Sequence, residues 1–186
     1  KYFMNKLDVK GLLTKPRILI CCPTNITSVE QKAIREAAEK SGGKKVYLEE
    51  EPKIAAIGAG MDIFQPSGNM VIDIGGGTTD IAVLSMGDIV TSASIKMAGD
   101  KFDAEILNYI KRKYKLLIGE RTAEDIKVKV ATVSKGTRNE TIEVRGRDMV
   151  NGLPRTITVN SEEIEEALRE SIYVIVQAAK TVLENT

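Results

Sequence analysis

Three consecutive glycines, Gly75–Gly77, constrain this chain more than any other stretch of its sequence. Residues 69–74 before them are rich in β-branched side chains and predict a buried strand, and residues 81–84 predict a second strand. Glycine permits positive φ angles and lets the backbone approach a ligand without a Cβ atom in the way. The stretch therefore predicts two strands joined by a tight turn that is open to a ligand.

An acid and two threonines flank the glycines and indicate the kind of ligand. Asp73 ends the first strand, and Thr78 and Thr79 precede the second. Successive backbone N–H groups in such a turn bind an anion, and the hydroxyls add further donors. Mg²⁺ takes oxygen ligands and keeps several waters, so an acid beside a phosphate-binding turn suits a Mg²⁺-nucleotide. We therefore expect a nucleotide site here.

Two other phosphate-binding loops do not fit this stretch. A Walker A loop has a lysine followed by serine or threonine at the start of a helix, whereas this turn holds no lysine and precedes a strand. A Rossmann fingerprint needs G-x-G-x-x-G at the start of a helix, which is also absent. A glycine-rich hairpin without a ligand is the simpler alternative, but an acid and two threonines around three glycines argue against it.

Composition excludes several classes of function. The 186 residues, 42% hydrophobic and 28% charged, suit one or two ordinary globular domains, and a net charge of +1 gives no bias toward nucleic acid. No histidine is present, which excludes Ser-His-Asp and Cys-His catalysis within the chain. Adjacent Cys21 and Cys22 favour reduced, buried thiols and a cytosolic compartment. No stretch approaches the ~18 consecutive apolar residues of a membrane span.

The first part of the chain predicts a β-α-β unit with parallel strands. Residues 17–22 form a short apolar run closed by a proline, which suits a strand buried on both faces. A helix follows, with Thr27 or Ser28 as its N-cap and a glycine pair at its end. Residues 46–48 predict the next strand.

Three acids, Glu49–Glu51, follow that strand and precede Pro52, which suits the first turn of a helix. Ligands of open α/β sheets lie just outside the carboxyl ends of the strands. One interpretation is a solvated helix start favoured by the helix dipole. The other is that one of the acids positions a water for attack on a phosphate.

The chain continues through a linker at 62–68, which is a plausible domain boundary, to the glycine segment. A turn at Gly87-Asp88 leads to a third strand, 89–97. A helix begins at Gly99 and Asp100, whose backbone N–H groups could meet a ligand at this strand-to-helix junction. The apolar stripe of that helix indicates core packing.

A further helix is predicted over 119–130, where Glu124 and Lys127 lie three residues apart on one face. By spacing alone they are a surface ion pair. Residues 141–145 and 156–159 predict a small antiparallel sheet with Gly146 in the connection.

Asn160 or Ser161 caps a last helix that runs to the chain end. A strand at 172–176 is the competing prediction, but the flanking residues favour helix.

Six segments together resemble bacterial actin, the MreB family, and most closely its MreB-like (Mbl) branch. The glycine turn alone would indicate only the wider superfamily of actin, heat-shock ATPase chaperones and sugar kinases. The resemblance implies an α/β, actin-like (ribonuclease H-like) ATPase fold, a mixed sheet flanked by helices with a small α+β subdomain inserted. The segments that carry it are 23–43, 49–61, 66–90, 95–103, 118–127 and 145–171.

The resemblance also implies a division of the chain and roles for single residues. Residues 1–67 would be part of a first large subdomain, 68–116 the start of a second, 117–160 the small subdomain and 161–186 a returning helix. ATP or ADP with Mg²⁺ would be bound. Asp73 would act on Mg²⁺, Glu51 would polarise the attacking water and Thr78 would help to place it. The residues expected to contact the nucleotide are Gly75, Gly76, Gly77, Thr78, Thr79, Gly99, Asp100, Glu124 and Lys127.

Partners and location follow from the same resemblance. The family forms filaments at the inner face of the cell membrane, in the cytoplasm, and guides wall synthesis with the elongation machinery and membrane adaptor proteins. Leu12 and Leu13, which by themselves suit either a membrane contact or a cap on the core, fall where some members have a membrane-touching loop.

Two phosphate- and adenine-binding loops of the family are missing from the sequence, so we expect the chain to correspond to a middle segment. Segments 134–136 and 172–173 look unusual for the family. A sugar-kinase-type phosphotransferase and a chaperone-type ATPase are the alternatives. The first would need an acidic base beside a sugar pocket and the second a separate substrate domain, and neither is evident.

Overall fold

The computed structural model describes residues 2, 6 and 16–186 and divides the chain into two compact units. The first unit comprises Lys1–Asp73, Asp80–Ser94 and Val182–Thr186, and the second comprises Ile74–Thr79 and Ile95–Thr181. The four-segment division inferred from the sequence remains a prediction. Each unit is described by itself below.

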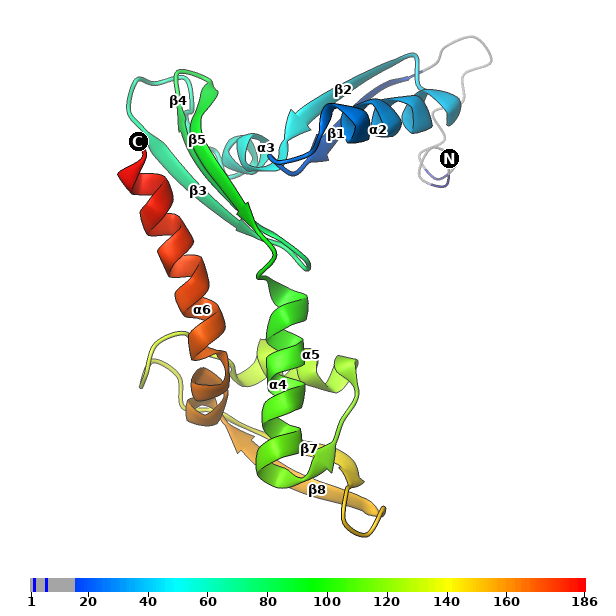
Figure 1. Cartoon of the computed structure of the whole chain (residues 1–186), viewed down its shortest axis with the longest axis vertical. Helices are drawn as coiled ribbons and strands as arrows, with labels where there is room; N and C mark the ends of the chain where they lie inside the picture. Colours follow the sequence, from blue (N-terminus) through cyan, green and yellow to red (C-terminus); the bar gives the residue numbers. More distant parts are fainter. Residues whose placement is uncertain (1, 3–5, 7–15) are drawn as a thin grey trace. The chain divides into compact units, whose positions relative to one another are not determined.

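The first unit opens with the predicted parallel β-α-β arrangement. Strand β1 (Arg17–Cys22) pairs in parallel with β2 (Lys45–Glu50), and helix α2 (Ser28–Lys40) lies alongside them (Figure 1). Thr27 caps α2, because its hydroxyl accepts from the Glu30 N–H while the Glu30 carboxylate accepts from the Thr27 N–H at 2.7 Å. This reciprocal capping box fixes where the helix begins.

The expected burial of β1 on both faces is wrong. Leu19 is 55% exposed and Cys21 is exposed, whereas Cys22 is buried. The described sheet has two strands and α2 buries none of its residues against it, so alternate side chains of β1 face solvent. Both cysteines are free thiols, as predicted, but only one of them is buried.

A second sheet in the order β3-β4-β5 carries the glycine turn. Its strands are β3 (Asn69–Ile74), β4 (Thr79–Ser85) and β5 (Asp88–Ile95). β4 is buried along nearly its whole length, whereas Ile72 and Ile74 of β3 are about half exposed. The prediction of a buried β3 is therefore wrong, because the middle strand of the sheet has neighbours on both sides and the edge strand does not.

A small core joins this sheet to helix α3 (Glu51–Gly58), which directly follows β2. Ala56, Ile63 and Leu84 are buried at its centre. The turn between β4 and β5 consists of Met86 and Gly87, with φ angles of 54° and 84°, one residue earlier than predicted. Two consecutive positive φ angles are those of a type I′ hairpin turn.

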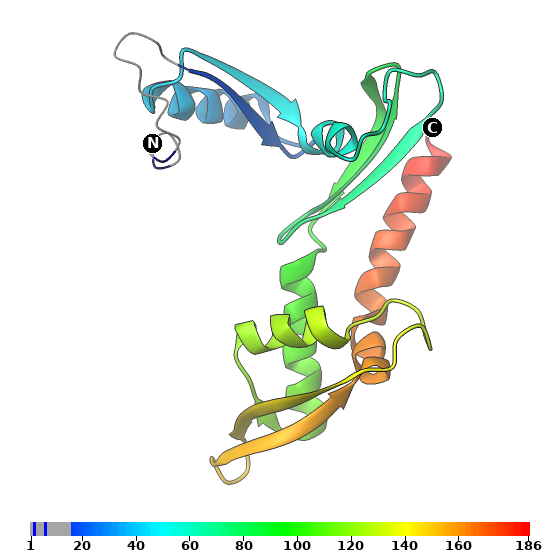
Figure 2. The ribbon, with the colours of Figure 1, turned by 180° about the vertical axis from the view of Figure 1, so that it is seen from behind.

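The second unit contains three helices and a small antiparallel sheet, in which α5 crosses α4 (Figure 2). β7 pairs with β8 in antiparallel register, and the two-residue β6, which the sequence did not predict, adds to the edge of β7. The bounds are α4 (Gly99–Tyr114), β6 (Leu116–Leu117), α5 (Glu120–Val130), β7 (Thr141–Asp148), β8 (Pro154–Asn160) and α6 (Ser161–Glu184).

Gly146 lies inside β7 and not in the connection as expected. A Cβ atom at this position would overlap the Leu117 carbonyl oxygen and lie 2.8 Å from the Leu116 side chain. Glycine is therefore what allows β6 to approach β7.

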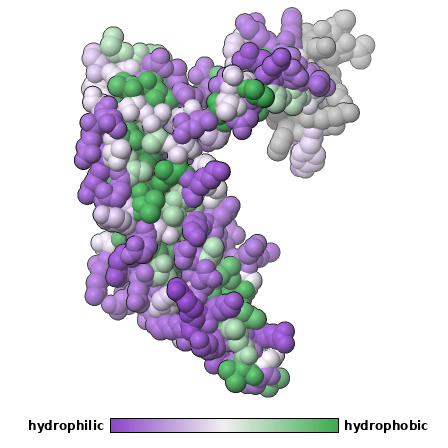
Figure 3. All heavy atoms as spheres, in the orientation of Figure 1, coloured by the Kyte–Doolittle hydropathy of each residue, from purple (hydrophilic) through white to green (hydrophobic). Residues whose placement is uncertain are grey.

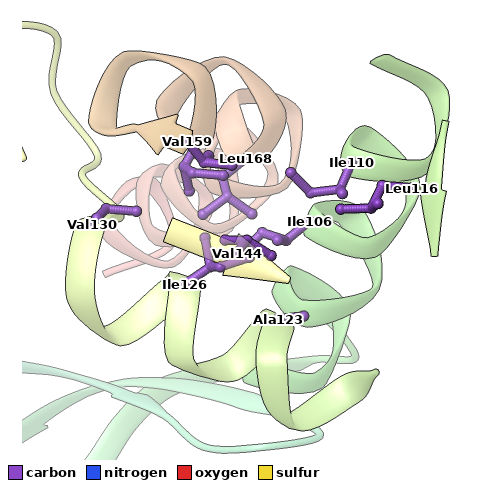
Figure 4. Close-up of a cluster of buried hydrophobic side chains, with 10 residues drawn as sticks. Ile106, Ile110, Leu116, Ala123, Ile126, Val130, Val144, Val159 and Leu168 are labelled. Atoms are coloured by element: carbon purple, nitrogen blue, oxygen red, sulfur yellow. The ribbon is translucent and has the colours of Figure 1, made fainter. Parts of the chain in front are cut away.

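The core of the second unit is aliphatic and joins α4, α5, α6 and the sheet (Figure 4). Ile106 and Ile110 come from the predicted stripe of α4, and Phe102, Leu107 and Tyr114 of that stripe pack at its edge. The buried residues are Ile106, Ile110, Leu116, Ala123, Ile126, Val130, Val144, Val159, Ile164 and Leu168.

Helix α6 is a single helix, including the stretch 172–176 for which a strand competed. The Glu163 N–H donates to the Asn160 side chain at 2.9 Å, and the Asn160 N–H donates to the Glu163 carboxylate at 3.0 Å, which confirms Asn160 as the cap. Within the part of the chain that the structure describes, no helix combines the length and apolarity needed to cross a bilayer.

Apolar side chains gather at the end of the β7–β8 hairpin (Figure 3). Met149, Val150 and Leu153 are 46%, 85% and 62% exposed there. The turn that presents them is held by the Asp148 carboxylate, which accepts from the Val150 N–H at 2.7 Å and pairs with Arg155 at 3.0 Å.

Candidate functional site

The glycine turn is fastened to the start of α4 by two backbone hydrogen bonds. The Gly99 N–H donates to the Gly75 carbonyl at 3.1 Å, and the Asp100 N–H donates to the Gly76 carbonyl at 2.8 Å. The turn itself is closed by the Gly75 N–H, which donates to the Thr78 carbonyl at 2.9 Å. The structure thus brings together the two segments that the sequence analysis singled out.

The same bonds correct one expectation about α4. The backbone N–H groups of Gly99 and Asp100 were expected to be open to a ligand, but both donate to carbonyls of the glycine turn. A helix terminus whose first donors are already used offers less to an anion. Any contact that these two residues make with a nucleotide therefore comes from other atoms.

Close approach, and not backbone conformation, accounts for Gly75 and Gly76. None of Gly75, Gly76 and Gly77 has a φ angle in the left-handed region that the sequence suggested for them. A Cβ atom on Gly75 would lie 3.3 Å from the Thr78 carbonyl oxygen, and one on Gly76 would lie 3.4 Å from the Asp100 carboxylate. Gly77 meets no atom within 4 Å, so its backbone is the part of the turn that a ligand can approach.

The two threonines after the turn differ in what their hydroxyls do. Thr79 is fully buried and donates its hydroxyl to the Met97 carbonyl at 2.6 Å. Its hydroxyl is therefore engaged inside the protein, where it connects the start of β4 to the residues that follow β5. Thr78 is half-buried, and its hydroxyl has no hydrogen-bond partner among the described residues. Thr78 is thus the threonine with a donor to offer.

In the first unit, Glu51 differs from the two acids before it. Glu49 pairs with Lys53 at 3.7 Å, and Glu50 is the N-cap residue of α3. Burial raises the pKa of both Glu50 and Glu51, but the carboxylate that raises it further is chiefly that of Asp88 for Glu50, whereas those of Asp80 and Asp73 do so for Glu51. Glu51 therefore lies in an acidic neighbourhood, unlike a solvated residue at the start of a helix.

Asp80 is a buried acid that the sequence analysis did not single out. It is 1% exposed, and the N–H and hydroxyl of Thr24 each lie 3.4 Å from its Oδ1 atom. These contacts tie the loop after β1 to β4 within the first unit. Among the described residues no group of three or more metal-ligating side chains comes together.

The predicted ion pair between Glu124 and Lys127 is wrong. The Lys127 ammonium lies 2.9 Å from Asp103 Oδ2 and 3.3 Å from the Gly99 carbonyl oxygen, while Glu124 is exposed and has no ion pair among the described residues. The tertiary contact between α4 and α5 outcompetes the local pair. Sequence reasoning missed Asp103, although it follows Gly99 by one helical turn and so shares its face of α4.

A pocket of about 450 Å³ lies beside the glycine turn in the second unit. Gly75, Gly99 and Lys127 line one part of it, and apolar side chains of α4, of α6 and of the segment after α5 line the rest, including Phe102 and Leu168. A mostly apolar pocket with few polar groups is typical of a small-molecule site. Leu12 and Leu13, the predicted membrane contact, lie outside the described residues.

Comparisons with known proteins agree with the resemblance seen in the sequence. The family model described as MreB/Mbl protein matches residues 1–186. The cell shape-determining protein Mbl of Bacillus subtilis (strain 168) is 83% identical over all 186 residues, which cover 56% of that protein. MreB of Escherichia coli (strain K12) is 49% identical over 169 residues, which are 91% of this chain and 49% of that protein.

Solved structures give the same result for the fold. MreB5 of Spiroplasma citri bound to ADP matches with a TM-score of 0.93 and 39% identity over the whole chain and 55% of that protein. The AMPPNP-bound form of the same protein matches equally well and is covered over 56% of its length. The fold is therefore the mixed α/β fold of the actin-like proteins, and the chain spans about half the length of its relatives. The chain belongs to the MreB/Mbl family.

Proposed function

We propose that the full-length protein is a bacterial actin that binds and hydrolyses ATP and assembles into filaments that determine cell shape. The observation that carries this proposal is the glycine turn fastened to α4, with Gly77 left open. Relatives named cell shape-determining protein support it, as do the ADP- and AMPPNP-bound forms of the Spiroplasma protein.

The turn suits the phosphates of the nucleotide. Gly76 and Gly77 have no side chains to obstruct a phosphate, and the free hydroxyl of Thr78 can donate to one. Because the bonds from Gly99 and Asp100 hold the turn in place, little conformational entropy has to be lost on binding.

The pocket beside the turn suits the nucleoside. Its volume of about 450 Å³ and its apolar lining fit a flat base, and the Lys127 ammonium offers a donor at its edge. Exposed Glu124 on the same helix is free to accept from the ligand. We therefore assign the pocket to the ribose and adenine side.

Hydrolysis is assigned to Glu51, with help from Thr78. The Glu51 carboxylate accepts a hydrogen bond from the attacking water and orients it, and the hydroxyl of Thr78 helps to place it. Asp73 would be the residue that holds Mg²⁺. Burial and then the carboxylates of Asp80 and Asp73 raise the pKa of Glu51, and a cation bound at Asp73 would offset the negative charge near Glu51. Mg²⁺, when bound, neutralises charge on the phosphates.

Filaments at the inner face of the membrane, directing wall synthesis with adaptor proteins, complete the proposal. Leu12 and Leu13 are the residues proposed to touch the membrane. A phosphotransferase of the sugar-kinase type and a chaperone-type ATPase are the alternatives, and both require a second substrate that a self-assembling ATPase does not.

The test is nucleotide-dependent pelleting of the full-length protein, with electron microscopy of the pellet. Filaments that form with ATP and Mg²⁺ and no second substrate support the proposal, and ATP hydrolysis without polymer under any condition favours the alternatives. Glu51→Ala tests the catalytic assignment: we expect turnover to fall by about 10²-fold, in the range for positioned acid–base groups, with ATP affinity nearly unchanged. Equal turnover in variant and parent would remove Glu51 from the mechanism.

A further inference from the structure

Asp103 is a carboxylate whose contacts go beyond what the fold requires. Its Oδ2 atom accepts from the Lys127 ammonium at 2.9 Å, and the two side chains are only 17% and 22% exposed. Lys127 also donates to the Gly99 carbonyl at 3.3 Å. One carboxylate on α4 thus holds a lysine of α5 against the residue that fastens the glycine turn.

The other oxygen of Asp103 argues against a purely structural role. Oδ1 is buried and has no hydrogen-bond partner among the described residues. A buried carboxylate oxygen without a partner costs stability, and such violations concentrate at functional sites. An aliphatic residue in this place would avoid that cost, so the charge on Asp103 has another use.

That use follows from the donors of Lys127. An ammonium has three N–H groups, of which two are directed to Asp103 and Gly99. Lys127 also lines the pocket beside the glycine turn, which leaves its third N–H for a ligand. This pocket is assigned above to the nucleoside and the glycine turn to the phosphates, so the ligand oxygen that this N–H would meet is a sugar hydroxyl.

We propose that Asp103 is a positioning residue for nucleotide recognition: it holds the Lys127 ammonium against Gly99 so that one N–H is directed to a hydroxyl of the ligand's sugar. This inference rests on the proposed nucleotide-binding function. It gives Asp103 a part in sugar specificity, which no local sequence spacing indicates.

The experiment compares ATP, 2′-deoxy-ATP and 3′-deoxy-ATP binding to the full-length protein with Mg²⁺. We expect the parent to lose roughly 3- to 10-fold in affinity for one deoxy analogue, the effect of one hydrogen bond. In Asp103→Ala the ratio of the affinity for ATP to the affinity for that deoxy analogue falls close to one. A merely structural role would weaken all three nucleotides equally and leave the ratio unchanged.

Glu105→Gln is the matched control. Glu105 is another acid of α4, and it pairs with Lys101 at 3.1 Å. The Glu105→Gln variant should keep the parent's ratio of affinities for ATP and the deoxy analogue. If Asp103→Ala does not fold, as judged by its circular dichroism, Asp103→Asn takes its place, because it keeps the volume and removes the charge; its ratio also falls below that of the parent.

The outcomes separate this inference from the proposed function. A parent that binds no ATP overturns both. Two results would overturn only the role of Asp103. In one, the parent binds ATP and the Asp103 variants prefer ATP over the deoxy analogue as strongly as the parent does. In the other, the parent binds ATP and both deoxy analogues equally well.

Discussion

The Asp100 N–H donates to the Gly76 carbonyl at 2.8 Å, which joins the first turn of α4 directly to the glycine turn. With the parallel bond from Gly99 to Gly75, this contact uses helix donors to hold a loop and not a ligand. We therefore expect the affinity for the nucleotide to depend on how closely α4 approaches the turn. Gly99, which has no side chain, allows that approach.

Gly99→Ala is expected to weaken nucleotide binding about tenfold with a smaller effect on stability. The added methyl group would lie 3.3 Å from the Gly75 carbonyl oxygen and 3.4 Å from the Lys127 ammonium, so the turn or the lysine has to shift. Isothermal titration with ATP measures the effect. Gly119→Ala, where the methyl group meets no atom within 4 Å, is the control and should bind like the parent.

The pH dependence of ATP turnover should show the raised pKa of Glu51. Burial and then Asp80 and Asp73 raise that pKa, so the carboxylate takes up its proton at a higher pH than an ordinary glutamate. The ionised carboxylate is a much stronger acceptor for the attacking water than the neutral acid, so turnover falls as the pH drops through this raised value.

Asp80→Asn removes one of the charges responsible and should move the acid limb of the profile to lower pH. Asp88→Asn is the control, since Asp88 raises the pKa of Glu50 and is not among the causes at Glu51. An acid limb that stays in place in Asp80→Asn contradicts the electrostatic argument.

Gly146→Ala should destabilise the full-length protein by about 3 kcal/mol, at the upper end for overpacking. The new Cβ atom would overlap the Leu117 carbonyl oxygen and lie 2.9 Å from the Ile118 side chain, and backbone atoms cannot yield as a flexible side chain can. Urea unfolding measures the change. Gly58→Ala lies in helix α3 with open space around it and should instead stabilise by about 0.5–1 kcal/mol.

Glu163→Gln should cost roughly 2 kcal/mol at neutral pH, because the Glu163 carboxylate accepts from the Lys113 ammonium at 2.6 Å and the Tyr114 hydroxyl at 2.5 Å. Burial raises the pKa of Glu163, but these hydrogen bonds outweigh it and the pKa is lowered overall. A lowered folded-state pKa contributes stability that is present above the unfolded-state pKa and lost as the pH falls through the folded-state value.

The parent should therefore lose stability in acid more steeply than Glu163→Gln. Unfolding free energies measured between pH about 7 and 3 test this. Glu162→Gln is the neighbouring control: its ion pair with Lys135, at 3.5 Å, joins side chains that are 72% and 78% exposed, so little should change. Parallel pH curves for parent and Glu163→Gln would contradict the argument.

Features that depend on neighbouring residues, such as helix caps and the apolar face of a helix, were predicted correctly from the sequence. The capping residues Thr27 and Asn160 are where the spacing of acids indicated, and the apolar stripe of α4 packs as the helical period requires. These features depend on residues three or four positions apart, which a sequence shows directly.

Contacts between distant residues were not predictable in this way. Lys127 pairs with Asp103, 24 residues earlier, and not with Glu124 on its own helix. The Thr79 hydroxyl bonds to Met97, 18 residues later. Both contacts depend on how the helices and strands pack. A run of glycines in the sequence likewise does not show whether positive φ angles or close approach of other atoms requires them.

The Met86-Gly87 turn has a consequence for the evolution of this hairpin. Ile89 packs on the core of the first unit while Val90 is 55% exposed, and a loop of two residues leaves no slack between the strands. A single inserted or deleted codon here would reverse the facing of every side chain in β5, sending Ile89 outward and Val90 inward. Changes in the length of this hairpin are therefore expected in steps of two residues, which keep each side chain of β5 on its own face of the sheet.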